Sequence, residues 1–289
     1  MSSLRPRRSV LYMPAANERA LEKAKTIPAD AIIFDLEDAV APDAKEAARE
    51  NAVAAATTGD YGHRELTIRC NGLDTPWGAA DIAAAAGTSA AAIVIPKVTS
   101  TDHLNEVEAQ LRAAGAPEDM TIWAMVETPT AIFDIRSIAT HPRVNVLVMG
   151  TNDLIKELRA EQHADRAPLI PHLAMALLGA RETDKVILDG VYNDVKNPEG
   201  FLAEAQQGRA FGFDGKTLIH PTQVGPANDV WAPSEADIDY SQRVIEAFDE
   251  AVSEGRGVIT VDGRMIENLH VDNARRVLAT AAAIAELNG

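Results

Sequence analysis

Eight short apolar runs constrain the fold of this chain more than any other feature. They are rich in β-branched residues and span positions 9–14, 31–38, 65–72, 91–98, 121–128, 144–153, 185–193 and 214–221. Consecutive apolar residues without polar alternation are typical of strands buried on both faces of a parallel sheet. Because an alanine- and charge-rich stretch follows each run, the pattern predicts eight strand–helix units of about 30 residues each, the arithmetic of a TIM (β/α)8 barrel.

The segments between the runs carry helix signals. Asn17, Asp43 and the pair Thr101–Asp102 stand at expected helix starts, and Gly115 stands at the expected end of the third helix. A doubly wound open sheet is the alternative fold, but no GxGxxG motif follows the first run. We therefore expect the barrel.

The C-terminal part of the chain exceeds what a barrel needs after its eighth strand. We expect a barrel domain over 1–232 and a C-terminal extension over 233–289. The extension is predicted to hold a helix from Pro233–Ser234 to Gly255, a hairpin turning at Asp262–Gly263, and a last helix over 272–287. Its core is too small to fold alone, which predicts that it packs on the barrel or on a neighbouring subunit.

The composition excludes several classes of protein. With 27 basic and 43 acidic side chains the net charge is −16, whereas nucleic-acid-binding proteins are typically basic. Cys70 is the single cysteine, so we expect no disulfide framework and a buried thiol. The N-terminus lacks a signal-peptide pattern, and no run reaches the roughly 18 apolar residues of a membrane span. We expect a cytoplasmic protein with no nucleic-acid or membrane partner.

Polar side chains gather where the predicted strands end. They are Asp35, Glu37, Asp38, Arg69, Asn71, Lys97, Glu127, Asn152, Asp153, Tyr192, Asn193, Asp194 and His220. In TIM barrels the carboxyl ends of the strands carry the active site, and the opposite end serves stability. Charged groups on buried strands are costly unless they are paired or bind a metal ion. We therefore expect one shared polar site at this end of the barrel.

The carboxylates among these residues point to a hard cation. Several carboxylates around one mouth would repel one another unless cations compensated them. The seven histidines form no HxH or HxxxH pair suited to zinc, whereas Mg²⁺, or Mn²⁺, binds through one or two carboxylates and water. Glu127 and Asp153 follow neighbouring strands and are the natural ligands. Ion pairs of these two residues with Lys97 or Arg69 are the alternative.

Two cationic features complement the carboxylates. Arg69 carries a fork-shaped donor that suits a substrate carboxylate, and its pairing with Glu37 or Asp38 is an alternative compatible with that role. Residues 1–29 carry a balance of +4 on an otherwise acidic chain. There, Arg19 and Lys23 share one helix face. This face either holds the phosphates of a large anionic ligand or is simply solvated.

Nine stretches of the chain carry a resemblance to a known family. They are RSVLYMPAANERALEKA, IIFDLEDAVAPDAKEAAR, IRCNG, IPKV, VETPTAIFDI, MGTNDL, DGVYND, GFDGKTLIHPTQV and VDGRMIENLH. In order and over nearly the whole chain, they resemble the HpcH/HpaI aldolase–citrate lyase β family, and within it the stand-alone malyl-CoA and citramalyl-CoA enzymes. The GTNDL, DGVYN and IENLH segments are most similar to stand-alone (3S)-malyl-CoA thioesterases.

The resemblance implies a Mg²⁺-dependent TIM barrel that acts on CoA thioesters of short hydroxy acids. It implies that Arg69 binds the acid portion of the substrate and acts in catalysis. Glu127 and Asp153 fall on the metal ligands of the family pattern, with Glu127 also in contact with substrate. The resemblance further implies a homotrimer or a homohexamer.

Five more residues receive roles from the resemblance. Glu37 and Asp38 fall on the LEDAV stretch as catalytic groups that organise water. Tyr12, Arg19 and Lys23 fall where such enzymes contact CoA, which is bound as part of the substrate.

The C-terminal extension departs from the family pattern at one catalytic position. In similar CoA lyases a tail carboxylate reaches into the neighbouring subunit's site, and it is usually an Asp in a GxMID-like segment. This chain has GRMIE, which places Glu267 there, with Asp262 as the backup candidate. The extra methylene moves the carboxylate by about an ångström, a misplacement that costs roughly 10²-fold in a positioned reaction. A base displaced from the enolate carbon is suited instead to a hydrolytic water.

The resemblance therefore implies hydrolysis of (3S)-malyl-CoA to malate and CoA. The close alternative is retro-Claisen cleavage of malyl-CoA or citramalyl-CoA to acetyl-CoA and a 2-oxo acid. A third interpretation is a citrate lyase β subunit that acts on carrier-bound acyl groups. The long C-terminal tail argues against it, because we expect the subunits of such complexes to be shorter there. A phosphoenolpyruvate-handling barrel is a fourth, for which the sequence has no phosphohistidine or nucleotide-binding motif.

Overall fold

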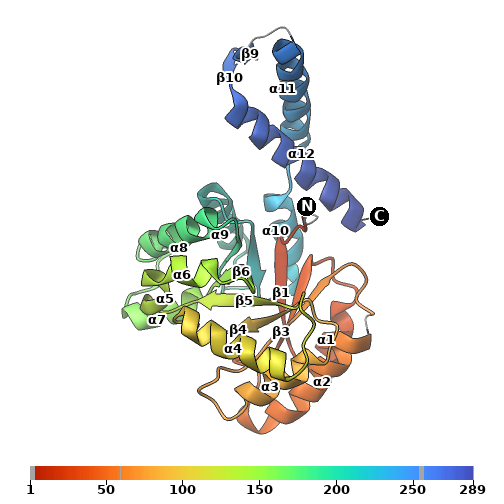
Figure 1. The fold of residues 1–289 in the computed structure, drawn as a ribbon, viewed down its shortest axis with the longest axis vertical. Helices are drawn as coiled ribbons and strands as arrows, with labels where there is room; N and C mark the ends of the chain where they lie inside the picture. The colour runs from red at the N-terminus through yellow and green to blue at the C-terminus, as the bar shows by residue number, and fades with distance from the viewer. Residues whose placement is uncertain (1–3, 59, 254–256, 289) are drawn as a thin grey trace. The chain divides into compact units, whose positions relative to one another are not determined.

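The chain folds into two compact units. The structure, a computed structural model, describes residues 4–58, 60–253 and 257–288. The first unit covers Arg7–Val230, and the second covers residues 1–6 and 231–289. The first contains the barrel, and the second contains two long helices and a β-hairpin (Figure 1).

Eight parallel strands close into a barrel in chain order. They are β1 (Ser9–Pro14), β2 (Ala31–Asp35), β3 (Glu65–Arg69), β4 (Ala92–Ile95), β5 (Thr121–Val126), β6 (Val144–Met149), β7 (Val186–Asp189) and β8 (Gly215–Leu218). The predicted TIM barrel is confirmed. The open doubly wound sheet is wrong, because β1 pairs with both β2 and β8. Each strand ends at or before its predicted last residue.

Helices connect successive strands and surround the barrel (Figure 1). They are α1 (Glu18–Ala24), α2 (Lys45–Thr58), α3 (Gly78–Ala86), α4 (Thr101–Ala113), α5 (Pro129–Phe133), α6 (Ile135–Thr140), α7 (Thr151–Leu158), α8 (Ile170–Glu182), α9 (Pro198–Phe211) and α10 (Val224–Trp231), with 3₁₀ turns η1 (Pro42–Ala44) and η2 (Pro221–Gln223). Among the helices described, none has the length and apolarity needed to cross a bilayer.

The predicted helix boundaries hold in part. The Asn17 side chain caps α1 as expected. The helix expected from Asp43 begins as the 3₁₀ turn η1 and continues as α2 from Lys45. The cap of α4 is Ser100, one residue before the predicted pair, because its hydroxyl accepts from a main-chain N–H of the first turn. Gly115, with φ +77°, follows the end of α4 in the left-handed conformation that favours glycine.

Apolar side chains, mostly aliphatic, fill the barrel interior, in keeping with an aromatic content of 4%. The interior cluster comprises Val10, Ala31, Ile33, Ala92, Val94, Trp123, Met125, Val146, Val148 and Leu188. At the amino ends of the strands, the ion pairs Arg7–Glu65 (2.6 Å) and Arg8–Asp30 (2.8 Å) are buried. Because these charges neutralise one another, the amino ends of the strands stabilise the barrel, and the carboxyl ends of the strands are where a site is expected. Cys70 is fully buried, as predicted.

The second unit pairs two helices with a short hairpin. Its elements are α11 (Glu235–Ser253), β9 (Ile259–Val261), β10 (Arg264–Ile266) and α12 (Asn268–Asn288). The predicted turn is confirmed, since Asp262 and Gly263 have φ values of +49° and +75°, typical of a type I′ turn. The predicted helix end at Gly255 lies outside the described residues. The last helix begins at Asn268, before the predicted start at 272, because the carbonyl of Glu267 already accepts first-turn hydrogen bonds.

Candidate active site

A cavity of about 330 Å³ opens where the barrel strands end, and we call it the mouth cavity. It is lined by Tyr12, Pro14, Asp35, Asp38, Ala39, Arg69, Met125, Glu127, Met149, Gly150, Thr151, Asn152, Asp153, Val191, Asn193, Thr217 and Ile219. The structure thus brings together most of the polar strand ends. Six of the predicted residues are not among those that line this cavity. Asn71 is buried against Lys45 and Asp81, and His220 caps η2. The other four are Glu37, Lys97, Tyr192 and Asp194.

Arg69 is clamped at one side of the mouth cavity. Its Nε and Nη2 donate to the two carboxylate oxygens of Asp35, both at 2.7 Å. Its Nη1 lies 2.8 Å from Glu37 and 3.6 Å from Asp38. The alternative ion pairs foreseen for Arg69 are therefore present. Burial lowers the pKa of Arg69, but the neighbouring carboxylates outweigh burial and raise it well above its ordinary value. The guanidinium is a fixed cation, and a substrate carboxylate would share Nη1 with these anions.

Glu127 lines the same cavity and directly follows β5. Its side chain is 2% exposed, and Oε1 accepts from the main-chain N–H of Lys97 at 2.6 Å. Burial, together with repulsion from Glu37 and Asp153, raises the pKa of Glu127 to about 8, against the opposing effects of the Lys97 hydrogen bond and Arg69. The ionised form of Glu127 is thus poorly compensated by the protein alone.

Asp153 completes a pair of carboxylates suited to a cation. It lies in the first turn of α7, half-buried, and lines the same cavity as Glu127. Within the described ranges no group of three His, Cys, Asp or Glu side chains forms a ready metal cage. Two carboxylates with room for water instead match Mg²⁺, which takes few protein ligands and keeps several waters. The donor set therefore fits a hard divalent cation.

Glu37 bridges the two sides of the site. Its carboxylate contacts Arg69 and lies 3.7 Å from the ammonium of Lys97. Burial raises the pKa of Glu37, although Arg69 opposes this shift. The turn that carries it is held by the buried Lys45, whose ammonium donates to the carbonyls of Leu36 and Glu37 at 2.8 and 2.7 Å. Asp38, in contrast, has a 67% exposed side chain at the cavity wall.

The structure separates the three residues expected to contact CoA. Tyr12 lies inside the mouth cavity, with its ring centre 4.7 Å from the guanidinium carbon of Arg69. Burial raises the pKa of its phenol, so the hydroxyl stays protonated. Arg19 and Lys23 are exposed on α1 and are not among the residues that line the mouth cavity.

Glu267 and Asp262 both belong to the second unit. Glu267 immediately precedes α12, and its main-chain N–H donates to Nδ1 of His270 at 3.0 Å. Asp262 occupies the hairpin turn, and both its carboxylate oxygens contact Arg243, at 2.9 and 2.8 Å. This pairing leaves Asp262 less suited than Glu267 to act as a base.

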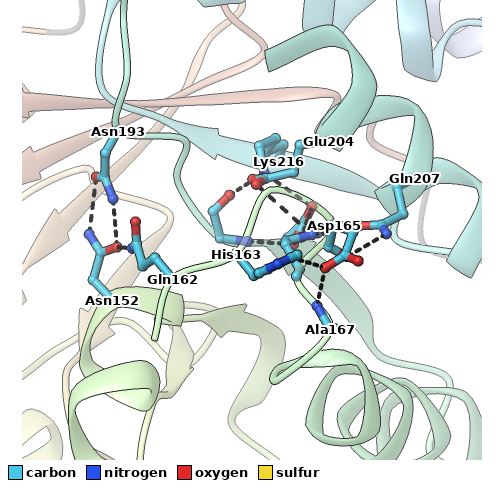
Figure 2. Close-up of polar contacts among 12 residues, drawn as sticks. Asn152, Gln162, His163, Asp165, Ala167, Asn193, Glu204, Gln207 and Lys216 are labelled. Atoms are coloured by element: carbon cyan, nitrogen blue, oxygen red, sulfur yellow. Dashed lines mark hydrogen bonds and ion pairs between the residues drawn. The ribbon is translucent and has the colours of Figure 1, made fainter. Parts of the chain in front are cut away.

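The sequence analysis placed Asn152 and Asn193 at the shared site but did not predict that their amides pair at the edge of the mouth cavity. Asn152 and Asn193 exchange hydrogen bonds of 3.1 and 2.7 Å, and Gln162 donates to Asn152 at 3.3 Å (Figure 2). Both asparagines also line a second cavity of about 400 Å³, the side cavity. The pair therefore stands at the boundary between the two cavities. The GTND and VYND segments held the signal, since both asparagines end a predicted strand.

A buried charge network was also missed. Lys216, fully buried on β8, contacts Asp189 at 3.1 Å and Glu204 at 2.7 Å, and Arg166 contacts Asp189 at 2.7 Å. Figure 2 shows Lys216 and Glu204 side by side. The two cations and two carboxylates balance, so this network anchors the chain before α8 to the barrel. Its signal in the sequence was the position of Asp189 and Lys216, two charged residues inside predicted strands.

Comparisons with known proteins agree with this geometry. The family model for HpcH/HpaI aldolase/citrate lyase matches residues 8–221. A (3S)-malyl-CoA thioesterase of Cereibacter sphaeroides is 51% identical over 280 residues, covering 97% of this chain and 96% of that protein. A citrate lyase subunit beta of Escherichia coli is 34% identical over 291 residues, covering 99% of this chain and 95% of that subunit. The expectation that such subunits lack a comparable tail is therefore wrong.

Solved structures show the same architecture. The CitE protein of Mycobacterium tuberculosis, in complex with magnesium, acetoacetate and coenzyme A, superimposes with a TM-score of 0.80 at 28% identity, covering 96% of this chain and all of that one. RipC of Yersinia pestis superimposes with a TM-score of 0.68 at 29% identity, covering 80% of this chain and 97% of that one. Together with the matching family model, these relatives show that the chain is an enzyme of the HpcH/HpaI aldolase/citrate lyase family.

Proposed function

We propose that this enzyme hydrolyses (3S)-malyl-CoA to malate and CoA in a Mg²⁺-dependent reaction. The observation that carries the proposal is the 51% identity to a (3S)-malyl-CoA thioesterase over 97% of the chain. The mouth cavity supports it, because Arg69, held by Asp35, lines the same cavity as Glu127 and Asp153, a pair of carboxylates suited to a cation. The CitE complex with magnesium and coenzyme A gives a family precedent for both ligands.

The residues of the mouth cavity divide the work between binding and water activation. Glu127 and Asp153 would hold the cation, which would supply Lewis-acid polarisation and positive charge when bound. Arg69 orients the free carboxylate of the acyl group, aided by the Tyr12 ring stacked on it. Glu37 and Asp38 organise the water. The water gives a proton to a general base as its oxygen bonds to the thioester carbon. The C–S bond then breaks, and the leaving sulfur takes up the proton that the base received.

We assign the general base to Glu267 of a neighbouring subunit. The second unit exposes 62% of Met265 and 63% of Leu269, two large apolar side chains that flank this carboxylate. Such side chains gain from being covered by another surface. A homotrimer or homohexamer in which each tail completes the next site supplies that surface. The lone buried Cys70 is in keeping with a reducing, cytoplasmic setting.

We place the CoA phosphates near Arg19 and Lys23. Both side chains are exposed on α1, the helix that follows β1. Pro14, at the end of β1, lines the mouth cavity, so α1 starts beside the opening. Two exposed cations one turn apart suit phosphate groups on an otherwise acidic protein.

Retro-Claisen cleavage to acetyl-CoA and glyoxylate is the second candidate. It is favoured by the 34% identity to a citrate lyase subunit beta, and it uses the same cation and arginine. Incubation of the purified enzyme with malyl-CoA and Mg²⁺ separates the two reactions. Hydrolysis gives malate and CoA in equal amounts without glyoxylate. If glyoxylate and acetyl-CoA accumulate instead, the thioesterase assignment is wrong.

A further inference from the structure

The carboxylate of Glu127 is oriented by the main chain and not by a partner side chain. Oε1 accepts from the N–H of Lys97 at 2.6 Å. Oε2 lies 2.2 Å from the position that a Cβ on Gly150 would take, so a side chain there would clash with it. In the part of the chain that is described, no side chain donates to Glu127 or forms an ion pair with it. We propose that Gly150 and the main chain of Lys97 are positioning residues for this metal ligand, an inference that rests on the proposed metal site.

Gly150 is required for space and not for its backbone conformation. Its φ of −96° and ψ of +76° are open to residues with a side chain. An added Cβ would lie 2.4 Å from the Cβ of Glu127 and 3.0 Å from its Cδ. Rotation about χ1 of Glu127 cannot move its Cβ, because that atom lies on the rotation axis, and the residue directly follows β5. An alanine at 150 therefore forces apart the end of β5 and the start of α7.

This displacement would separate the two proposed metal ligands. Gly150 donates to the carbonyl of Val126 at 3.1 Å, which joins the residue before α7 to the end of β5. Glu127 follows Val126, and Asp153 lies in the first turn of α7. The spacing of Glu127 and Asp153 thus depends on the close approach of the Gly150 main chain to the Glu127 side chain, which only glycine allows. Substitutions that disturb such supporting contacts typically weaken metal binding about 10- to 100-fold.

Lys97 contributes its N–H, held in a conformation that costs energy for a residue with a Cβ. Its φ is +49°, in the left-handed region. Its ammonium is half exposed and lies 3.7 Å from Glu37, so the main chain makes the direct contact with Glu127. A glycine at 97 keeps the donor and adopts this conformation without strain. A main-chain donor also adds no net charge, which leaves the ionised carboxylate available to a cation.

The inference is tested by Mn²⁺ binding, followed as the loss of the free-ion EPR signal on titration with protein. Gly150→Ala is expected to bind Mn²⁺ about 10- to 100-fold more weakly than the wild type. Lys97→Gly is expected to bind at least as tightly as the wild type, because the main-chain donor stays and a positive charge that repels the cation is removed. Gly225→Ala, on α10, is the matched control, because an added Cβ there meets nothing within 4 Å. Wild-type affinity in Gly150→Ala, or lost affinity in Lys97→Gly, overturns the assignment.

A metal-free readout separates this inference from the proposed function. Thermal unfolding in EDTA is compared for the wild type, Gly150→Ala, Glu127→Gly and the double variant. Introduced into the wild-type chain, Gly150→Ala should lower the unfolding midpoint. Introduced into Glu127→Gly, it should lower the midpoint much less, because the side-chain atoms of Glu127 that clash with the new Cβ are gone. Equal shifts in the two backgrounds refute the steric assignment. A wild type that binds no Mn²⁺ but shows this coupling refutes the metal site and retains the packing role of Gly150.

Discussion

Replacement of Arg69 by lysine tests whether the site needs a guanidinium or only a positive charge. The two 2.7 Å hydrogen bonds to Asp35 and the 2.8 Å contact with Glu37 use the full fork of the side chain. A lysine keeps the charge but loses at least one charge-assisted hydrogen bond, worth about 1.5–3 kcal/mol. For a domain of this size, we expect a fall in the unfolding midpoint of roughly 3–12 °C.

Arg69→Lys should also lower catalytic activity, and by more than the loss of one stabilising hydrogen bond would suggest. A point charge holds a carboxylate less rigidly than a planar fork, and an ångström of misplacement costs roughly 10²-fold in rate. We therefore expect kcat/KM for malyl-CoA to fall about 10²-fold at saturating Mg²⁺. The assay is initial-rate CoA release, with calorimetry on the same preparation and Arg69→Met as the uncharged comparison. Wild-type kinetics with a lowered midpoint would show that Arg69 only balances Asp35 and Glu37.

Three further predictions concern the cation, the assembly and the thiol. Glu127→Gln or Asp153→Asn should abolish Mg²⁺-dependent turnover. Because the pKa of Glu127 is raised to about 8, wild-type Mg²⁺ affinity should rise with pH up to about 8, and calorimetric titration at several pH values should find this dependence lost in Glu127→Gln. Glu267→Ala should bind Mg²⁺ but not turn over, and subunit exchange with Arg69→Ala should restore CoA release; without rescue, the tail does not act across subunits. Burial raises the pKa of the Cys70 thiol well above its ordinary value, so Ellman's reagent should label it only after unfolding, and fast labelling of the native enzyme would contradict the buried setting.

The architecture was predictable because parallel strands leave a pattern that survives without tertiary information. Each strand of a barrel is buried on both faces, so its sequence is continuously apolar and stands out from the amphipathic helices. The ends of the strands were less predictable. The run from 144 to 153 reads as one strand, yet β6 stops at Met149 and Asn152 and Asp153 belong to α7. Apolar character marks what is buried, and it does not mark where the chain turns out of the sheet.

The sequence indicated which side chains gather at the site, but the individual ion pairs among them were harder to predict. The sequence placed Asp35, Glu37 and Arg69 at one mouth, and it offered Glu37 or Asp38 as the partner of the arginine. The structure gives the bidentate position to Asp35, because Asp35 and Arg69 are register partners on neighbouring strands. Register between strands depends on the closure of the whole barrel, and no local pattern in either strand encodes it.

The charge of the finished site implies an order of binding. Around the mouth cavity the carboxylates of Asp35, Glu37, Asp38 and Asp153, joined by Glu127 above about pH 8, outnumber the three cations Arg69, Lys97 and Lys45. Like charges 4 Å apart repel by about 4 kcal/mol near a protein surface. A free carboxylate therefore meets net repulsion until a divalent cation is bound.

We predict that malate binds the enzyme only together with Mg²⁺. Calorimetric titration with malate should give heat in Mg²⁺ and none in EDTA. Asp153→Asn in EDTA should bind malate more tightly than the wild type in EDTA, because one repelling charge is gone while Arg69 stays in place. This variant separates the removal of negative charge from ligation by the metal. Equal malate affinity for the wild type in Mg²⁺ and in EDTA would show that Arg69 recognises the acid without help, and the binding order argued from the charge balance would be wrong.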